Sequence, residues 1–277
     1  MKTLSLPSGR KIPILGQGTW RMGEKASQQQ TEIEALRFGI DLGMTLIDTA
    51  EMYGEGGAEK IVAKAIAGCR DRIYLVSKFY PHNASYQGVL RACDRSLSRL
   101  ETDYLDLYLL HWRGSTPLSE TLEALQYLQQ SGKILDYGVS NFDTDDMEEA
   151  LALAGGSALA TDQVLYNLMR RGIEWDLLPW CRQRKIPIMA YCPLEQGAFV
   201  RHSGLQAIAT KYNATPTQIA LSWLLHQDNV ISIPKSSNRD RLLENYSALE
   251  LQLTPADIQQ LDRIFPPPKR KQTLAIR

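Results

Sequence analysis

The alternation of short β-type runs with helical patterns constrains the fold of this 277-residue chain more than any other feature. The predicted strands are residues 15–20, 45–49, 73–78, 104–111, 134–140, 161–167, 186–193 and 230–236. Their ends follow one another at a mean step of about 31 residues, which is the length of one βα unit. Parallel strands joined by crossover helices produce this pattern, and eight such units close into a (β/α)₈ TIM barrel.

Turn and capping signals define several element ends. Residues 3–14 have alternating apolar side chains around Pro7-Ser8-Gly9, which predicts an N-terminal β-hairpin that caps the barrel floor. Ser27 is expected to be the N-cap of the first helix, and Thr254-Pro255 starts an additional C-terminal helix after the eighth unit. Since no linker or change of composition divides the chain, residues 1–277 are expected to form a single barrel domain.

A doubly wound sheet of the Rossmann type is the competing α/β fold. Its first turn needs the pattern Gly-x-Gly-x-x-Gly, which lets the backbone approach a pyrophosphate. The stretch Gly16-Gln17-Gly18-Thr19-Trp20-Arg21 has arginine where the third glycine is required. The barrel is therefore favoured.

The charge balance argues against a general polyanion-binding role. The chain has 31 Lys and Arg residues against 31 Asp and Glu residues, and its basic run Lys269-Arg270-Lys271 lies in a proline-rich tail. No run of about 18 apolar residues could span a membrane, and residues 1–10 lack the apolar core of a signal peptide. We therefore expect a cytoplasmic protein that binds neither nucleic acid nor membranes. A monomer is also expected, although neither the charge balance nor the apolar pattern bears on the oligomeric state.

Cysteine and histidine spacing argues against a disulfide or metal centre. The four cysteines include no Cys-x-x-Cys pair and are expected to be reduced thiols. The histidines other than His111 fall in predicted loops or helices away from it, at His82, His202 and His226. We therefore expect no metal site.

Polar side chains occur at the carboxyl ends of seven predicted strands, where the active sites of such barrels lie. They are Asp48 with Tyr53 beyond it, Lys78, His111, Ser140-Asn141, Gln163 with Asn167, Tyr191, and Lys235-Ser236. Each of them taken alone is more often structural than catalytic. Together they would converge on one cavity, which predicts an active site.

Asp48, Tyr53, Lys78 and His111 form a chemically coherent set. The phenol of Tyr53 has an ordinary pKa of about 10, so it donates a proton poorly near neutrality unless a cation stabilises the phenolate. Lys78 can be that cation, and Asp48 can keep the buried ammonium charged and oriented. His111 would offer a hydrogen bond to a substrate oxygen.

Six stretches, in order along nearly the whole chain, resemble those of the aldo-keto reductases. They are LIDTAEMYG at 46–54, VSK at 76–78, LLHW at 109–112, GVSNF at 138–142, AYCPL at 190–194 and IPKS at 233–236. The resemblance implies a (β/α)₈ barrel that binds NADPH in extended form without a Rossmann fold. It also implies that Asp48, Tyr53, Lys78 and His111 form a catalytic tetrad.

The resemblance further implies contacts to the nicotinamide. Ser140, Asn141 and Gln163 would hold its carboxamide, and Tyr191 would stack on its ring. Additional cofactor contacts are expected at Gly18 and Thr19, in the first predicted strand, and at Pro193 and Leu194, in the stretch 190–194. Hydride from the nicotinamide and a proton from Tyr53 would then reduce small aldehydes, methylglyoxal-like 2-oxoaldehydes included.

The position of positive charge also predicts where the phosphate end of the cofactor binds. Lys235-Ser236 and Asn238 stand at the start of a predicted helix over 238–247, where unpaired amides and the helix dipole favour an anion. Arg241, one turn along, adds a planar fork suited to phosphate. NADH lacks the 2′-phosphate, so NADPH is expected. The resemblance places this phosphate here, with Glu244 and Asn245 on the adenine.

The substrate pocket is expected to be open. Trp20 and Trp112 would form an apolar wall beside the tetrad, but the tail after Phe265 is short and has no aromatic residue. We therefore expect an incomplete outer wall, broad activity on small aldehydes and little effect of deleting residues 269–277. The chain also departs from many relatives after the tyrosine, with Gly54-Glu55-Gly56-Gly57 in place of Gly-Asn-Glu.

Two other functions would use these residues differently. A nicotinamide-sensing interaction module would keep the fold and cofactor, although it has no need of an activated tyrosine. A carboxylate-pair hydrolase would use Asp48 and Glu51, provided that they face one another across a substrate.

Overall fold

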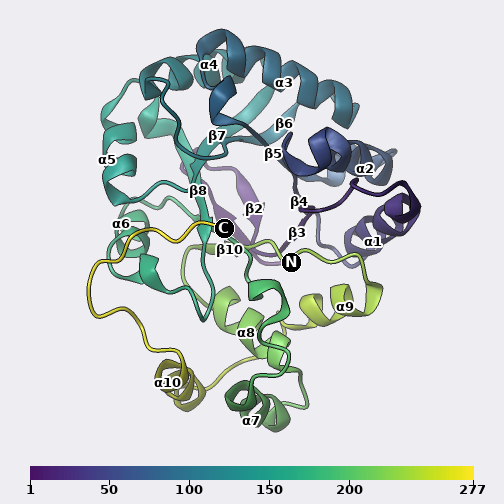
Figure 1. Cartoon of the computed structure of the whole chain (residues 1–277), viewed down its shortest axis with the longest axis vertical. Helices are drawn as coiled ribbons and strands as arrows, with labels where there is room; N and C mark the ends of the chain where they lie inside the picture. The colour runs from purple at the N-terminus through teal and green to yellow at the C-terminus, as the bar shows by residue number, and fades with distance from the viewer.

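The computed structural model describes all 277 residues and contains an eight-stranded parallel sheet (Figure 1). Its strands are β3 (Gly16–Gly18), β4 (Leu46–Asp48), β5 (Tyr74–Phe79), β6 (Leu105–Leu110), β7 (Ile134–Ser140), β8 (Leu159–Leu165), β9 (Ile188–Tyr191) and β10 (Val230–Ser232). Each strand pairs with the next one in sequence, and bridges from Leu15 to Ser232 and from Gly18 to Lys235 join the first strand to the last. The sheet thus closes, and the predicted (β/α)₈ barrel is confirmed.

Helices surround the barrel on its outside (Figure 1). Those that follow the successive strands are α1 (Gln29–Asp41), α2 (Gly57–Ile66), α3 (Tyr86–Leu100), α4 (Leu118–Gln130), α5 (Thr144–Ala152), α6 (Leu177–Gln183), α8 (Pro216–Leu225) and α9 (Arg239–Ser247). Two further helices are α7 (Ser203–Lys211), which precedes α8, and the predicted C-terminal helix α10 (Pro255–Ile264). None of these helices is long and apolar enough to cross a membrane.

Short 3₁₀ helices occupy several connections. They are η1 (Ala26–Gln28), η2 (Tyr53–Gly56), η3 (Arg70–Arg72), η4 (Pro81–Asn83), η5 (Gly156–Ala158), η6 (Gly172–Glu174) and η7 (Glu195–Gly197). The predicted cap at Ser27 is wrong, because Ser27 lies inside η1 and α1 follows Gln28 without a side-chain cap. The chain already turns at Ala26, so Ser27 is too far inside to act as a cap. Thr254 caps α10 as predicted.

The N-terminal hairpin closes one end of the barrel. Strands β1 (Thr3–Ser5) and β2 (Lys11–Pro13) pair antiparallel, as predicted. Leu6 and Ile12 are buried in one apolar cluster with inward-facing strand residues such as Leu46 and Val76. This packing excludes water from the amino-terminal end of the barrel, so the open end is the one at the carboxyl termini of the strands.

Successive strand residues alternate between two apolar layers. Leu46 and Val76 lie in the cluster inside the barrel, whereas Ile47 and Leu75 belong to the larger cluster between strands and helices. This alternation follows from the two-residue period of a β-strand. It fixes which side chains at the strand ends point into the barrel mouth, and it thereby positions the site.

Candidate active site

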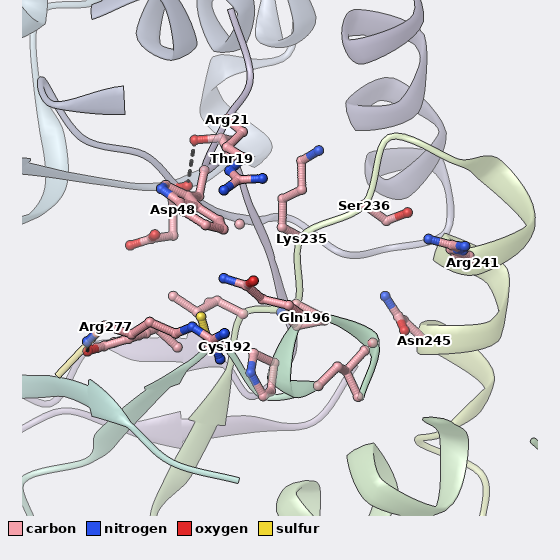
Figure 2. Close-up of a pocket in the computed structure, with 18 of the residues that line it drawn as sticks. Thr19, Arg21, Asp48, Cys192, Gln196, Lys235, Ser236, Arg241, Asn245 and Arg277 are labelled. Carbon is pink, nitrogen blue, oxygen red and sulfur yellow. Dashed lines mark hydrogen bonds between the residues drawn. The ribbon is translucent and has the colours of Figure 1, made fainter. Parts of the chain in front are cut away.

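A cavity of about 1290 Å³ opens at the carboxyl ends of the strands. Asp48, Tyr53 and His111 line one part of it, and Arg241 and Asn245 of α9 line another. Figure 2 shows Asp48 and Arg241 on opposite sides of this space. The cavity therefore joins the predicted tetrad to the predicted phosphate-binding helix.

The four predicted tetrad residues lie together. The Lys78 Nζ donates hydrogen bonds to Asp48 Oδ2 at 2.8 Å, to the Thr49 carbonyl oxygen at 2.9 Å and to the Tyr53 hydroxyl at 3.2 Å. Lys78 is fully buried, and Asp48 is only 2% exposed. The His111 ring packs edge-on against the Tyr53 ring, with 5.7 Å between their centroids. Tyr53 and His111 therefore face the cavity side by side, and Lys78 lies behind Tyr53, where Asp48 holds it.

Neighbouring strands bring these side chains to the same level. Asp48 is the last residue of β4 and is in register with Val76 of β5, so Lys78 lies one inward-facing position further along. Tyr53 begins η2, the turn that follows β4, and His111 comes directly after β6. Because in-register parallel strands end at one edge, residues 30 and more positions apart meet there.

Gly56 shapes the loop that follows Tyr53. Its φ is +81°, in the left-handed region that favours glycine. A Cβ atom at this position would lie 2.6 Å from Cδ and Nε of Arg99. Arg99 itself is held by Glu59, with Nε 2.5 Å from Oε2. The glycine-rich departure from the family pattern therefore lets the chain pass close to Arg99 on its way from Tyr53 into α2.

Burial controls the charges of the tetrad. It raises the pKa of the Tyr53 phenol well above its usual value, and Asp48 adds to this shift, so the hydroxyl remains protonated at neutral pH. Burial lowers the pKa of Lys78, while the Asp48 carboxylate opposes that change. Burial and the Lys78 charge lower the pKa of His111 to about 2, which keeps the imidazole neutral. The set thus contains a protonated donor, a paired cation and a neutral hydrogen-bonding group.

The residues predicted to hold the nicotinamide also meet in the cavity. They are Ser140, Asn141, Gln163 and Tyr191. The Gln163 Nε2 donates to Asp48 Oδ1 at 2.8 Å, which links this group to the tetrad, and its Oε1 has no hydrogen-bond partner in the protein. Asn141 Nδ2 donates to the His111 carbonyl oxygen at 3.0 Å, and the Tyr191 hydroxyl donates to Asn141 Oδ1 at 2.9 Å.

The part of the cavity predicted to bind the phosphate contains polar side chains without protein partners. Strand β10 ends at Ser232, earlier than predicted, and Lys235-Ser236 lies in the connection to α9. Asn238, predicted at the start of this helix, caps α9, with Oδ1 accepting the Arg241 N–H at 3.0 Å. The side chains of Lys235 and Arg241 are exposed and form no ion pair. Asn245 is 3% exposed, lines the cavity and makes no side-chain hydrogen bond.

The remaining predicted cofactor residues line the cavity as well. They are Gly18, Thr19, Pro193, Leu194, Ser236, Asn238 and Glu244. Thr19 Oγ1 donates to the Asp48 carbonyl oxygen at 3.0 Å. The carboxylate of Glu244 accepts a hydrogen bond from the hydroxyl of Thr215, the N-cap residue of α8, so this acid already has a partner in the protein.

The hydrolase interpretation is wrong, because Glu51 does not line the cavity. Its Oε1 accepts the Tyr80 N–H at 2.8 Å and the Asn83 Nδ2 at 2.7 Å, and its Oε2 pairs with Arg95 at 3.3 Å. Glu51 therefore holds the loop after β5 and is not placed to act together with Asp48 on a substrate. The structure also brings no cluster of three or more His, Cys, Asp or Glu side chains together as a metal site.

Both predicted wall residues, Trp20 and Trp112, line the cavity. Sequence reasoning missed Arg21, whose guanidinium lies 4.3 Å from the centre of the Trp20 ring. A signal for Arg21 was available, since it is a cation just past the first predicted strand. Gln196 also lines the cavity. Its place in the wall depends on left-handed backbone in the loop after β9, which no local sequence pattern predicts.

The tail takes part in the cavity wall, a contribution that the sequence did not predict. Residues 266–277, called the strap below, cross back over the barrel, and the chain end lies near its centre (Figure 1). Ile276 and Arg277 line the cavity. Backbone groups and charged side chains hold the strap, such as Lys271, which pairs with Asp145 at 3.3 Å.

The fold and the tetrad define a barrel oxidoreductase, and comparison with known proteins agrees. The chain belongs to the aldo/keto reductase family, whose sequence model matches residues 14–265. It is 49% identical over 278 residues to methylglyoxal reductase YeaE of Escherichia coli, covering 99% of this chain and 98% of that protein. It is 33% identical over 264 residues to glyoxal reductase of Bacillus subtilis, covering 95% and 92%.

A solved structure shows the same architecture with a cofactor. It is an aldo-keto reductase from Klebsiella pneumoniae in complex with NADPH. It matches this chain with a TM-score of 0.97 at 49% identity, and the match covers 99% of each chain.

Proposed function

We propose that this protein is an NADPH-dependent oxidoreductase that reduces small aldehydes, methylglyoxal among them, to alcohols. The observation that carries the proposal is the position of the buried Lys78 ammonium, 3.2 Å from the hydroxyl of Tyr53 in the cavity wall. The relatives support the substrate class, since YeaE is named a methylglyoxal reductase. The Klebsiella protein, in complex with NADPH, supports the cofactor.

The polar groups without protein partners fit NADPH. Lys235 and Arg241 would hold the 2′-phosphate beside the start of α9, where backbone amides and the helix dipole favour an anion. The nearly buried amide of Asn245 would meet the adenine, because it lines the cavity and has no protein partner. Oε1 of Gln163 is similarly free for the carboxamide. When bound, NADPH supplies the hydride for the carbonyl carbon.

The tetrad would supply the proton that the carbonyl oxygen of the substrate takes up. Tyr53 donates its hydroxyl proton to the carbonyl oxygen, and the Lys78 ammonium stabilises the phenolate that develops. Asp48 keeps that ammonium charged and aimed through the 2.8 Å ion pair. His111, neutral because its pKa is about 2, would orient the carbonyl oxygen by a hydrogen bond without competing for the proton.

We further propose that residues 1–277 act as one barrel domain and as a cytoplasmic monomer. This chain supplies both Tyr53 with its neighbours and the α9 residues Arg241 and Asn245 to the cavity wall. The four cysteines are unpaired, which suits a reducing compartment. Trp20 and Trp112 would bound the space for a small substrate.

The direct test is NADPH consumption with a panel of aldehydes, ketones and sugars. We expect fast turnover of small electrophilic aldehydes such as methylglyoxal and weak turnover of simple ketones. A protein that binds NADPH but oxidises it with none of these carbonyls would contradict the proposal, and would favour the nicotinamide-sensing module.

A further inference from the structure

The strap makes two contacts in the cavity that the proposed chemistry does not use. The Arg277 backbone N–H donates to the Tyr191 hydroxyl at 3.2 Å, and its Nη1 donates to Glu195 Oε1 at 2.7 Å. The Tyr191 hydroxyl donates in turn to Asn141 Oδ1 at 2.9 Å. The end of the strap is therefore connected to two of the predicted nicotinamide residues.

Glu195 joins the strap to two loops of the barrel mouth. This carboxylate is only 7% exposed. Besides Arg277 it accepts hydrogen bonds from Arg170 Nη2 at 3.1 Å and from Asn167 Nδ2 at 2.7 Å. Asn167, predicted at the end of a strand, lies past β8 and also donates to the Cys192 carbonyl oxygen at 2.9 Å. One buried acid thus ties together the loop after β8, the loop after β9 and the strap.

The loop after β9 depends on such external contacts. Cys192, Glu195 and Gln196 have φ values of 47°, 44° and 54°, a region that non-glycine residues rarely adopt. Strained backbone of this kind persists only where the surroundings hold it. Pro193 and Leu194 of this loop line the cavity beside Tyr191. The partners of Glu195 therefore help to set the shape of this cavity wall.

The strap is anchored at two points before its last residues. Arg171 Nη1 donates to the Phe265 carbonyl oxygen at 2.6 Å, just before the strap begins. Further along, Lys271 Nζ lies 3.3 Å from Asp145 and 3.4 Å from Asp176. These anchors lie on α5 and before α6, outside the cavity, and they direct the last residues across its mouth.

We propose that Arg277 is a positioning residue for the cofactor: the strap fixes Tyr191 and the Glu195 loop in the conformation that binds NADPH, and so slows its release. This inference rests on the proposed function. Arg277 makes no contact with Tyr53, Lys78 or His111 and takes no part in proton transfer. Its effect should therefore fall on cofactor affinity and dissociation rate, and only slightly on the chemical step.

Two variants test the proposal. Arg277→Ala removes the pair with Glu195 but keeps the backbone N–H, and deletion of residues 276–277 removes both contacts. NADPH affinity is measured by the change in its fluorescence on binding, and its dissociation rate by rapid displacement. Because the Arg277 side chain is 40% exposed, we expect Arg277→Ala to weaken NADPH binding about threefold to tenfold, mainly through faster release. The deletion should have a larger effect.

Matched variants separate positioning from general damage. Lys269→Ala alters an exposed strap residue without a side-chain contact and should leave NADPH binding unchanged. Arg277→Lys keeps a cation and should restore part of the affinity. Thermal unfolding should show that the point variants are folded.

The possible outcomes are distinct. Unchanged NADPH affinity in both Arg277→Ala and the deletion would overturn the inference, even if the KM for aldehydes rose, since the strap would then be only a substrate wall. Wild-type protein that fails to bind NADPH would instead overturn the proposed function.

Discussion

The two ends of the cavity differ in how their charges are satisfied. At the tetrad end, Lys78 and Asp48 are buried and pair with each other at 2.8 Å. At the α9 end, Lys235 and Arg241 are exposed and pair with no acid. A buried charge needs a partner inside the protein, whereas an exposed cation remains solvated until an anion arrives. The first arrangement suits a fixed chemical step, and the second suits a ligand that must bind and leave.

Among variants that test this difference between the two ends of the cavity, Tyr53→Phe is expected to have the largest effect, a loss of reductase activity. The ring and the ion pair behind it remain, but the proton donor is lost, so reduction should fall by about 10²–10⁴-fold. NADPH binding should be nearly unchanged, because the α9 end is untouched. Steady-state kinetics together with cofactor titration check both points, and a variant that kept more than half of the wild-type kcat would remove Tyr53 from the proposed role.

A pH effect of intermediate size is expected from His111, which is buried at the same end. Its pKa is lowered to about 2 in the folded protein, so the unfolded chain takes up a proton below about pH 6.5 that the folded protein does not. Wild-type protein should therefore lose stability as the pH falls, by about 1.4 kcal/mol per unit in this range. His111→Asn removes this contribution.

Urea unfolding at pH 6.5 and pH 4.5 measures the difference. Between these values the wild type should lose about 2–3 kcal/mol more than His111→Asn. His82→Asn, which alters an exposed histidine, should keep the wild-type dependence. Equal losses in wild type and His111→Asn would mean that His111 is not held neutral by burial.

The strand ends and the strap differ in how well their contacts can be predicted from the sequence. The grouping of Asp48, Tyr53, Lys78 and His111 in space could be predicted because each of them lies at or near the end of a strand, and strand ends of a parallel barrel meet. Arg277 and Glu195 are 82 positions apart, and their contact depends on how the whole strap packs. Local sequence patterns do not predict such a contact. A strap without aromatic residues therefore suggested an open pocket.

Glu51 shows a second limit of sequence reasoning. It lies three residues after Asp48, inside a stretch that carries two tetrad members. Its carboxylate nevertheless turns away to bind Tyr80, Asn83 and Arg95. Beyond the end of a strand the two-residue alternation no longer applies, so only the structure shows which way a side chain points.

The smallest effect is expected at the α9 end and concerns the choice of cofactor. Lys235→Ala and Arg241→Ala should each weaken NADPH binding about tenfold. A charge-assisted contact to phosphate contributes roughly 1.5–3 kcal/mol to binding, and solvent reduces this contribution at exposed positions. NADH binding should change little, since NADH has no 2′-phosphate. Fluorescence titrations with both cofactors give the ratio of the two losses.

Arg239→Ala is the matched control for this pair of variants. Arg239 is the first residue of α9 and an exposed cation, but it lies over the Phe38 ring at 4.4 Å and does not line the cavity. Its removal changes the net charge as much as the other substitutions do, so it tests whether a general loss of positive charge is enough. If Arg239→Ala spared NADPH while the other two did not, the effect would belong to their positions in the cavity. Equal losses of NADPH and NADH affinity in Lys235→Ala and Arg241→Ala would instead show that these two cations do not bind the 2′-phosphate. The difference between the two ends of the cavity would then reflect solvent exposure alone.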